Sequence, residues 1–261
     1  QSNLLSNFVN RIQERRVIEA ADGVIFTSRE TLGAVMGKYP ASWASKTFVL
    51  PHSFDPQLYP KVVAKQRKVI VRHLGNFYGA RTPYPLLRAL RLLWDRDREA
   101  LADVEIELIG RVPTGMHWHP VFRALPKDLV RIIDTIPYSE SLRLMSEADL
   151  LLVMDAPAQL SVFLPSKLID YVGAGKQVMG IVPPGTSASL IQRLGGSVAD
   201  PTRKEDVVDA LRSALHEARR RKSNGAGVWG DPGVRSEFLP ERTAGDFLNI
   251  LKAVVGARLL S

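Results

Sequence analysis

Residues 163–178 read Phe-Leu-Pro-Ser-Lys-Leu-Ile-Asp-Tyr-Val-Gly-Ala-Gly-Lys-Gln-Val. This pattern predicts a turn, a short helix, a glycine stop and a strand. Pro165 and Ser166 stand where a first turn and an N-cap belong, because both residue types are common at helix starts. Gly173 and Gly175 can end the helix, since glycine adopts a positive φ at little cost.

Apolar runs flank this stretch on both sides. Leu150–Met154 precedes it, and Val178–Val182 follows. Strand, helix and strand in this order predict a parallel βαβ unit, and sheets built from such units bind ligands at the carboxyl ends of their strands. The helix would begin at that edge, where free N–H groups and the positive end of the helix dipole favour phosphate.

Side chains of the predicted helix suit the same kind of ligand. Lys167 adds a cation, and Asp170, one turn further on, can accept hydrogen bonds from sugar hydroxyls. The backbone N–H groups of Leu164 and Ser166 can bind phosphate. A lysine in a first turn is unfavourable to the helix dipole, which makes an anionic partner more plausible. A solvated lysine and a surface aspartate remain the alternatives.

Strands and helices alternate along the rest of the chain, with strands predicted at 69–74 and 104–109 and a helix at about 84–98 between them. This order predicts an α/β fold with a doubly wound, parallel, Rossmann-like sheet. We expect a main unit over residues 61–222. Residues 1–60 hold too little structure to bury a core of their own and end in a linker. Residues 223–261 are expected to form a mobile, glycine-rich loop to about residue 236 and a last helix at 241–255. A further loop is expected at 111–125.

Composition excludes several function classes. The chain has 261 residues, 45% of them hydrophobic and 24% charged, which indicates a soluble globular protein. No apolar run is long enough to span a membrane, and no signal peptide is visible. Cysteine is absent, so disulfides and thiolate chemistry are excluded. No metal site is expected either, because His117 and His119 have no evident third ligand.

The charge balance is basic, with a formal net charge of +8. Such a balance fits nucleic acid, an anionic membrane surface or an anionic small ligand. The densest basic run, Arg219–Lys222, is typical of a solvated helix end, and a membrane-surface patch is the alternative. No nucleic-acid-binding module is recognisable, so nucleic acid is not an expected partner.

Two loops can add to a phosphate or nucleotide site. The loop at 73–82 follows the first strand of the main unit, where Gly75 would let the backbone approach a ligand and Arg81 could pair with a diphosphate. Its glycine spacing is not a dinucleotide fingerprint, so a simple strand-to-helix turn remains an alternative. Ile136 and Pro137 follow the predicted strand 129–133, and an ordinary strand-to-helix turn with Ser139 as the N-cap is equally compatible with them.

The stretch 163–178 resembles the donor-site signature of the retaining glycosyltransferases of family 4, which have the GT-B fold. Residues 21–28, Ala-Asp-Gly-Val-Ile-Phe-Thr-Ser, are similar to an element late in the N-terminal domain of that family. Residues 51–55, Pro-His-Ser-Phe-Asp, are similar to the turn that leads into its C-terminal domain. The resemblance therefore implies the C-terminal, donor-binding half, a remnant of the N-terminal acceptor domain, and a last helix that crosses back to it.

The resemblance also implies roles for single residues. Asp170 would bind the ribose of the donor, and Gly75 and Arg81 would contact the donor phosphates. A second phosphate-binding arginine of the family would fall near Asn76. The other residues implied at the donor site, for the base or the phosphates, are Ile136, Pro137, Leu164, Pro165, Ser166 and Lys167. The sequence departs from the family at Val162, where an acidic residue is frequent, and at Gln177, where proline is common.

The implied function is transfer of a sugar, with retention, from a nucleotide-sugar to a glycan, lipid or other acceptor. No metal and no cofactor beyond the nucleotide-sugar are expected, and no catalytic residue is assigned. A cytoplasmic role in polysaccharide biosynthesis is implied, with peripheral contact to the anionic inner face of a membrane as an option. Because most of the acceptor domain is missing, we expect the chain alone to be a poor catalyst. A non-catalytic nucleotide-sugar-binding module and a sugar-nucleotide epimerase of similar fold are the alternatives.

Overall fold

The computed structural model describes residues 4–60, 67–225 and 227–259. Its main body is a six-stranded, fully parallel sheet with the order β5-β4-β3-β6-β7-β8. The predicted α/β, doubly wound sheet is thereby confirmed. The chain winds outward in one direction from β3 and in the other from β6, so these two neighbours form the switch point of the sheet. The strands span Val69–Leu74 (β3), Val104–Ile109 (β4), Val130–Ile133 (β5), Leu150–Met154 (β6), Gln177–Ile181 (β7) and Ser197–Ala199 (β8).

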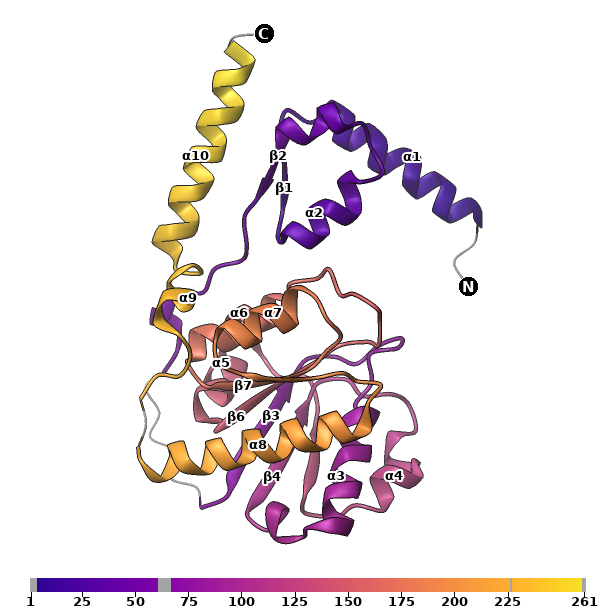
Figure 1. Ribbon diagram of the computed structural model, residues 1–261, viewed down its shortest axis with the longest axis vertical. Coiled ribbons are helices and arrows are strands. Elements are labelled where there is room, and N and C mark those ends of the chain that lie inside the picture. The colour runs from indigo at the N-terminus through magenta and orange to yellow at the C-terminus, as the bar shows by residue number, and fades with distance from the viewer. Residues whose placement is uncertain (1–3, 61–66, 226, 260–261) are drawn as a thin grey trace.

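Helices cover both faces of this sheet (Figure 1). One face packs against α3 (Tyr84–Arg96) and α8 (Lys204–Ser223), and the other against α5 (Tyr138–Glu147), α6 (Ser166–Ala174) and α7 (Thr186–Arg193). Successive strand residues alternate between the two cores: Val69 and Val71 belong to the α3–α8 side, and Leu74 belongs to the α5–α6–α7 side.

The N-terminal residues form a small separate layer. It comprises α1 (Leu4–Ala20), β1 (Val24–Phe26), α2 (Arg29–Met36), η1 (Ala41–Lys46) and β2 (Thr47–Val49), followed by η2 (Pro56–Leu58). β1 and β2 pair in parallel as a two-stranded sheet. Its buried core consists of Ile18, Phe26 and Met36, so this layer buries far less apolar surface than the main body.

The last helix, α10 (Pro240–Leu259), leaves the main body and runs beside the N-terminal layer (Figure 1). A side chain at Gly23 would meet Val254 at 2.8 Å, so α10 lies in contact with that layer. The chain thus returns to its N-terminal part, over a helix slightly longer than the predicted 241–255.

A second contact joins the N-terminal layer to the main body at one backbone carbonyl. Val162 O accepts hydrogen bonds from Ser28 Oγ at 2.8 Å and from Thr31 Oγ1 at 2.7 Å, both of which belong to the start of α2. Thr186 Oγ1, at the start of α7, lies 3.2 Å from the same carbonyl and 2.8 Å from Glu30 Oε2. The loop between β6 and α6 is therefore held from both sides.

Two loop predictions need correction. The expected loop at 111–125 contains η4 (Met116–Trp118) and the short helix α4 (Pro120–Arg123), because Met116 and Leu125 are buried in the core and the segment folds back over them. The expected mobile loop at 223–236 contains α9 (Pro232–Ser236). Trp229 in that segment is buried, and its N–H donates to Gly175 O at 2.7 Å.

The basic run Arg219–Lys222 closes α8 and is largely paired within the chain. Arg219 binds Asp103, and Lys222 Nζ lies 2.6 Å from Asp149 Oδ2. Arg220 pairs with Glu217 one turn earlier on the helix. These contacts are those of a basic helix end whose charges are largely paired within the chain, and not those of a patch of unpaired cations.

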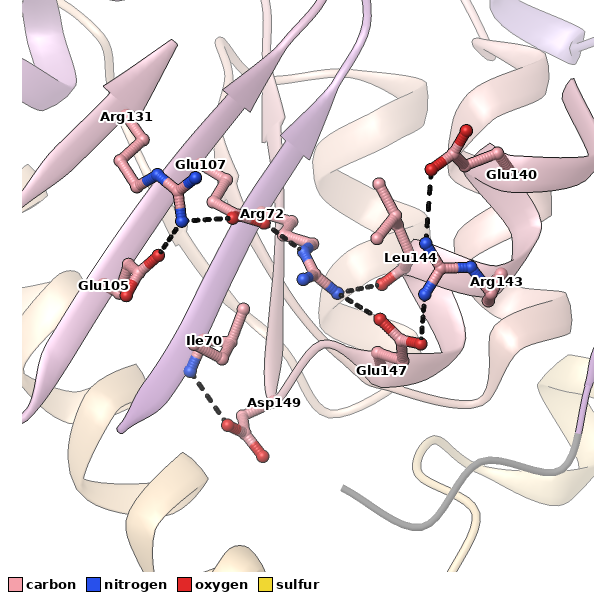
Figure 2. Close-up of polar contacts among 10 residues, drawn as sticks. All are labelled: Ile70, Arg72, Glu105, Glu107, Arg131, Glu140, Arg143, Leu144, Glu147 and Asp149. Atoms are coloured by element: carbon pink, nitrogen blue, oxygen red, sulfur yellow. Dashed lines mark hydrogen bonds and ion pairs between the residues drawn. The ribbon is translucent and has the colours of Figure 1, made fainter. Parts of the chain in front are cut away.

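A charged network lies inside the main body between β3, β4 and α5 (Figure 2). Arg72 is 4% exposed, and its Nε donates to Glu107 Oε2 at 2.6 Å. Its Nη1 donates to Leu144 O at 2.6 Å and lies 3.6 Å from Glu147. Since a buried charge is tolerated only when it is paired, this network fixes α5 against the central strand.

Candidate functional site

Two loops meet at the switch point of the sheet. The first follows β3 and leads to α3, and the second follows β6 and leads to α6. Tyr171 Oη on α6 accepts the backbone N–H of Leu74 at 2.8 Å, so α6 is fixed to the end of β3. The carboxyl ends of parallel strands at such a point are where doubly wound sheets bind ligands.

A cavity of about 230 Å³ opens between the loop after β3 and the start of α6. Four of the predicted site residues line it: Gly75, Asn76, Ile136 and Lys167. The remaining lining residues are Leu74, Ile109, Gly110, Thr135, Tyr138 and Ser141. The loops after β3, β4 and β5 and the first turns of α5 and α6 therefore contribute to one cavity.

A larger neighbouring cavity, of about 680 Å³, contains two further predicted residues, Ser166 and Asp170. Tyr138 lines both cavities. The other walls are the linker residues 50–53 and the first turns of α10, with Pro240, Thr243, Ala244 and Phe247. The other four predicted residues, Arg81, Pro137, Leu164 and Pro165, line neither of these two cavities.

The N-terminus of α6 differs from the prediction by one position. Pro165, in an extended conformation, is the N-cap, Ser166 is the first helical residue, and no side chain caps the helix. Within the described residues, the backbone N–H groups of Ser166 and Lys167 have no acceptor. These are the orphan donors of a first helical turn, and they can bind an anion.

Lys167 and Asp170 are already paired in the free chain. Lys167 Nζ lies 3.2 Å from Asp170 Oδ2 and 5.6 Å from the centre of the Tyr138 ring. Tyr138 Oη donates to Asp170 Oδ1 at 3.1 Å. Burial, followed by the negative charge of Asp170, raises the pKa of Tyr138, so the hydroxyl stays protonated as the donor.

Arg81 is held by a carboxylate of the second loop. Its Nη2 lies 2.8 Å from Asp155 Oδ1, and its guanidinium stacks over Tyr78 at 5.0 Å from the ring centre. The other oxygen of Asp155 accepts from Ser161 Oγ at 2.8 Å. Arg81 thus links the loop after β3 to the loop after β6 without entering the smaller cavity.

Asn76 has a structural role in this arrangement. Its Oδ1 accepts the backbone N–H of Arg111 at 2.9 Å, which ties the loop after β3 to the loop after β4. Gly110 lies beneath this contact, at φ +124°, and a side chain there would come within 2.6 Å of Gly75 O. Only glycine therefore fits at position 110.

Sequence reasoning left several lining residues out of the site. Gly110 directly follows a correctly predicted strand. A glycine at the carboxyl end of a parallel strand could therefore have been included in the predicted site. Tyr138 follows the predicted Ile136 and Pro137, but its orientation depends on α5 beginning at Tyr138, where the sequence predicted Ser139 as the N-cap. Thr135 and Ser141 carried no signal of their own.

His73 is a further buried group next to the site. Its Nδ1 lies 2.9 Å from Leu152 O, while its Nε2 is buried and has no partner among the described residues. Burial lowers the pKa of His73 to about 4, and the positive charges of Arg81 and Lys167 add to this effect.

The described part of the chain contains no group of three or more His, Cys, Asp or Glu residues arranged to hold a metal ion. Every helix in the described ranges is too short or too polar to cross a membrane.

Comparison with solved structures identifies the architecture. Anabaena HepE, solved with UDP-glucose, matches with a TM-score of 0.71 and 16% identity over 94% of this chain and 67% of its own. Thermosynechococcus elongatus sucrose-phosphate synthase matches with a TM-score of 0.67 and 17% identity, over 94% and 61%. The pneumococcal O-GlcNAc transferase GtfA, solved with UDP and GlcNAc, matches with a TM-score of 0.63 and 11% identity, over 90% and 46%. The chain has a GT-B type of fold.

The chain corresponds to only part of the length of these structures. The chain spans 66% of HepE in its complex with UDP and glucose, and less than half of GtfA. No family model and no curated protein sequence matches the chain. The GT-B likeness therefore rests on the fold, and the switch point described above is where its candidate site lies.

Proposed function

We propose that this chain is the donor-binding part of a nucleotide-sugar glycosyltransferase. The observation that carries the proposal is that Gly75 and Lys167 line one cavity at the switch point of a GT-B type sheet, while Ser166 and Asp170 line the cavity beside it. The first turn of α6, with its free N–H groups, contributes to both. Several structures of similar fold were solved with UDP or a UDP-sugar. A nucleoside diphosphate sugar is the ligand class that needs both a phosphate-binding helix end and a carboxylate for hydroxyls.

In this proposal the phosphates bind at the first turn of α6 and Lys167, and the ribose binds to Asp170. Nη2 and Nε of Arg81 remain hydrogen-bonded to Asp155 Oδ1. The Nη1 of Arg81 has no partner in the described part of the chain and would face the diphosphate. The base would contact the loop at Ile136 and Pro137. The neutral ligand end, the sugar, would extend toward the loop after β6.

The catalytic contribution proposed for these residues is electrostatic. When the bond between the sugar and the diphosphate breaks, negative charge builds on the leaving phosphate. Arg81, Lys167 and the N–H groups of α6 would stabilise that charge without a metal ion. Retention at the anomeric carbon, a glycan or lipid-linked acceptor, and a cytoplasmic location beside an anionic membrane remain part of the proposal.

A non-catalytic nucleotide-sugar-binding module is the second candidate, and two observations favour it. Asn76, where the resemblance would put a phosphate-binding arginine, is engaged with the backbone of Arg111. Val162, where it would put a carboxylate, contributes only its carbonyl, which binds Ser28 and Thr31. Product analysis of a longer chain that includes an acceptor domain separates the two candidates.

Calorimetric titration of UDP into the 261-residue chain tests the proposed site. We expect saturable binding that Asp170→Asn and Arg81→Gln each weaken by about ten- to a hundredfold, since contacts to charged groups contribute roughly 1.5–3 kcal/mol. Arg91 and Asp95 form an exposed pair on α3, away from the site. Arg91→Gln and Asp95→Asn are therefore matched controls, and we expect both to bind UDP like the wild type.

The outcomes separate clearly. UDP binding that is unaffected by Asp170→Asn and Arg81→Gln would place the ligand elsewhere and refute the site. Efficient sugar transfer by the isolated chain would refute the expectation that acceptor groups come from outside it.

A further inference from the structure

Tyr138 completes a closed set of contacts in the free chain. It is 56% exposed and is the first residue of α5. Its hydroxyl binds one oxygen of Asp170, Lys167 binds the other, and the Lys167 ammonium also lies over the Tyr138 ring. Every charged or donor group in this set therefore has its partner inside the set.

This set lies between the two cavities. The cavity beside Gly75 measures about 230 Å³, which is below the usual range of roughly 300–1,000 Å³ for small-molecule sites. The neighbouring cavity measures about 680 Å³, and Tyr138 lines both. A rotation of the Tyr138 side chain would join them, and an exposed side chain at a helix start can rotate between its staggered conformations within nanoseconds.

We infer that Tyr138 is a specificity-determining residue whose hydroxyl occupies the place of a ribose hydroxyl on Asp170 in the free chain. The inference rests on the proposed function, in which Asp170 binds the ribose of a nucleoside diphosphate. A ligand that presents a ribose hydroxyl replaces Tyr138 as the donor to Asp170, and the tyrosine moves aside.

Only a ligand with two features completes this exchange. Its ribose hydroxyl replaces Tyr138 on Asp170, and its phosphate binds Lys167. A ligand without ribose hydroxyls has no donor that could replace the Tyr138 hydroxyl on Asp170. Tyr138 therefore keeps its hydrogen bond to Asp170 when such a ligand binds. Tyr138 thereby weakens the binding of a ribose nucleotide by the strength of the contact that has to be broken. It leaves a ligand without ribose hydroxyls unaffected, so it reduces the preference of the site for ribose.

The test compares wild type and Tyr138→Phe, which removes the hydroxyl and keeps the ring over Lys167. Titrations use UDP and 2′,3′-dideoxyuridine diphosphate. We expect Tyr138→Phe to bind UDP about three- to tenfold more tightly than the wild type, because no competing hydrogen bond must be broken. The affinity for the dideoxy analogue should be the same in both proteins.

Tyr39→Phe is the matched control, since Tyr39 also donates its hydroxyl to a carboxylate, that of Glu14, but in the N-terminal layer. It should bind UDP like the wild type. If UDP binds the wild type and Tyr138→Phe equally, or if the dideoxy analogue gains as much as UDP, the inference about Tyr138 is overturned while the nucleotide site stands. If neither protein binds UDP, both the inference and the proposed function fail.

Discussion

His73 shows how a single residue can make the stability of the main body depend on pH. Its ring is buried, with one nitrogen on Leu152 O and the other without a partner among the described residues. Because a charged imidazolium would be desolvated there, the pKa of His73 falls to about 4, below the value of roughly 6.5 expected in the unfolded chain.

The sign of the effect follows from proton binding. The unfolded chain binds a proton at His73 more readily than the folded chain, so this contribution to stability is complete above roughly pH 6.5 and is lost as pH falls toward about 4. We expect the contribution to fall by about 2 kcal/mol between pH 7 and pH 5. Urea unfolding at both pH values should show the wild type losing that much more than His73→Asn. Equal losses in the two proteins would contradict the prediction.

Single residues also mark the limit of what the sequence could predict. The apolar run at 69–74 was correctly predicted as a strand, although it contains Arg72 and His73. Both side chains are buried because β3 lies inside the sheet. The charge of Arg72 is paired with Glu107 of the neighbouring strand, 35 residues away in sequence. Local pattern carries no information about such a partner.

Among the elements, α6 is the one whose sequence signals matched the structure best. Gly175 ends it in the left-handed conformation, at φ 61°, as the glycine stop predicted. The start moved by one residue because Pro165, and not Ser166, takes the N-cap position. The helix was predictable because proline and glycine act locally, whereas the contact of Tyr171 with β3 needed the fold.

That contact carries a prediction about α6. Tyr171 is buried, and its hydroxyl accepts the N–H of Leu74 at 2.8 Å. Tyr171→Phe leaves this buried N–H without a partner, and we expect a loss of about 1–3 kcal/mol in the free energy of unfolding. Chemical denaturation measures it. Tyr84→Phe is the control, because the Tyr84 hydroxyl has no hydrogen bond within the described residues, and a loss as large in Tyr84→Phe would argue against the hydrogen-bond explanation.

The loops were less predictable than the helices. The segment 111–125 contains proline and glycine at positions typical of a loop, yet it forms η4 and α4 over a buried Met116. For the same reason, the site was only partly predictable. Gly75, which directly follows β3, and Lys167, in the first turn of α6, were identified. Tyr138 acquires its role from contacts with α6 that lie 32 residues away in sequence.

In the molecule as a whole, the carbonyl of Val162 joins the N-terminal layer to the loop that precedes α6. Three hydroxyls, of Ser28, Thr31 and Thr186, lie within hydrogen-bond distance of it. The resemblance predicted that a remnant of an N-terminal domain precedes the main body and that the last helix returns to it. It did not predict the contact at Val162, because nothing in the sequence there indicates a carbonyl shared by both parts.

Removing one of these hydroxyls should loosen the loop. Thr31→Val keeps the shape of the side chain and deletes a hydrogen bond that contributes about 1 kcal/mol, so we expect backbone amides in residues 156–165 to exchange hydrogen about fivefold faster. Mass spectrometry of hydrogen exchange measures this rate. Thr47→Val is the control, because the Thr47 hydroxyl binds Ala44 O within its own turn. Unchanged exchange in Thr31→Val would mean that the loop is held by other contacts.

The two-stranded sheet of the N-terminal layer has a practical consequence. β1 pairs with β2 alone among the described strands, so each of the two strands keeps one edge of unpaired backbone groups. Such an edge is a template for a strand from another chain. In concentrated solution we expect a strand of a neighbouring molecule to add to this edge, which would lower the homogeneity of the sample.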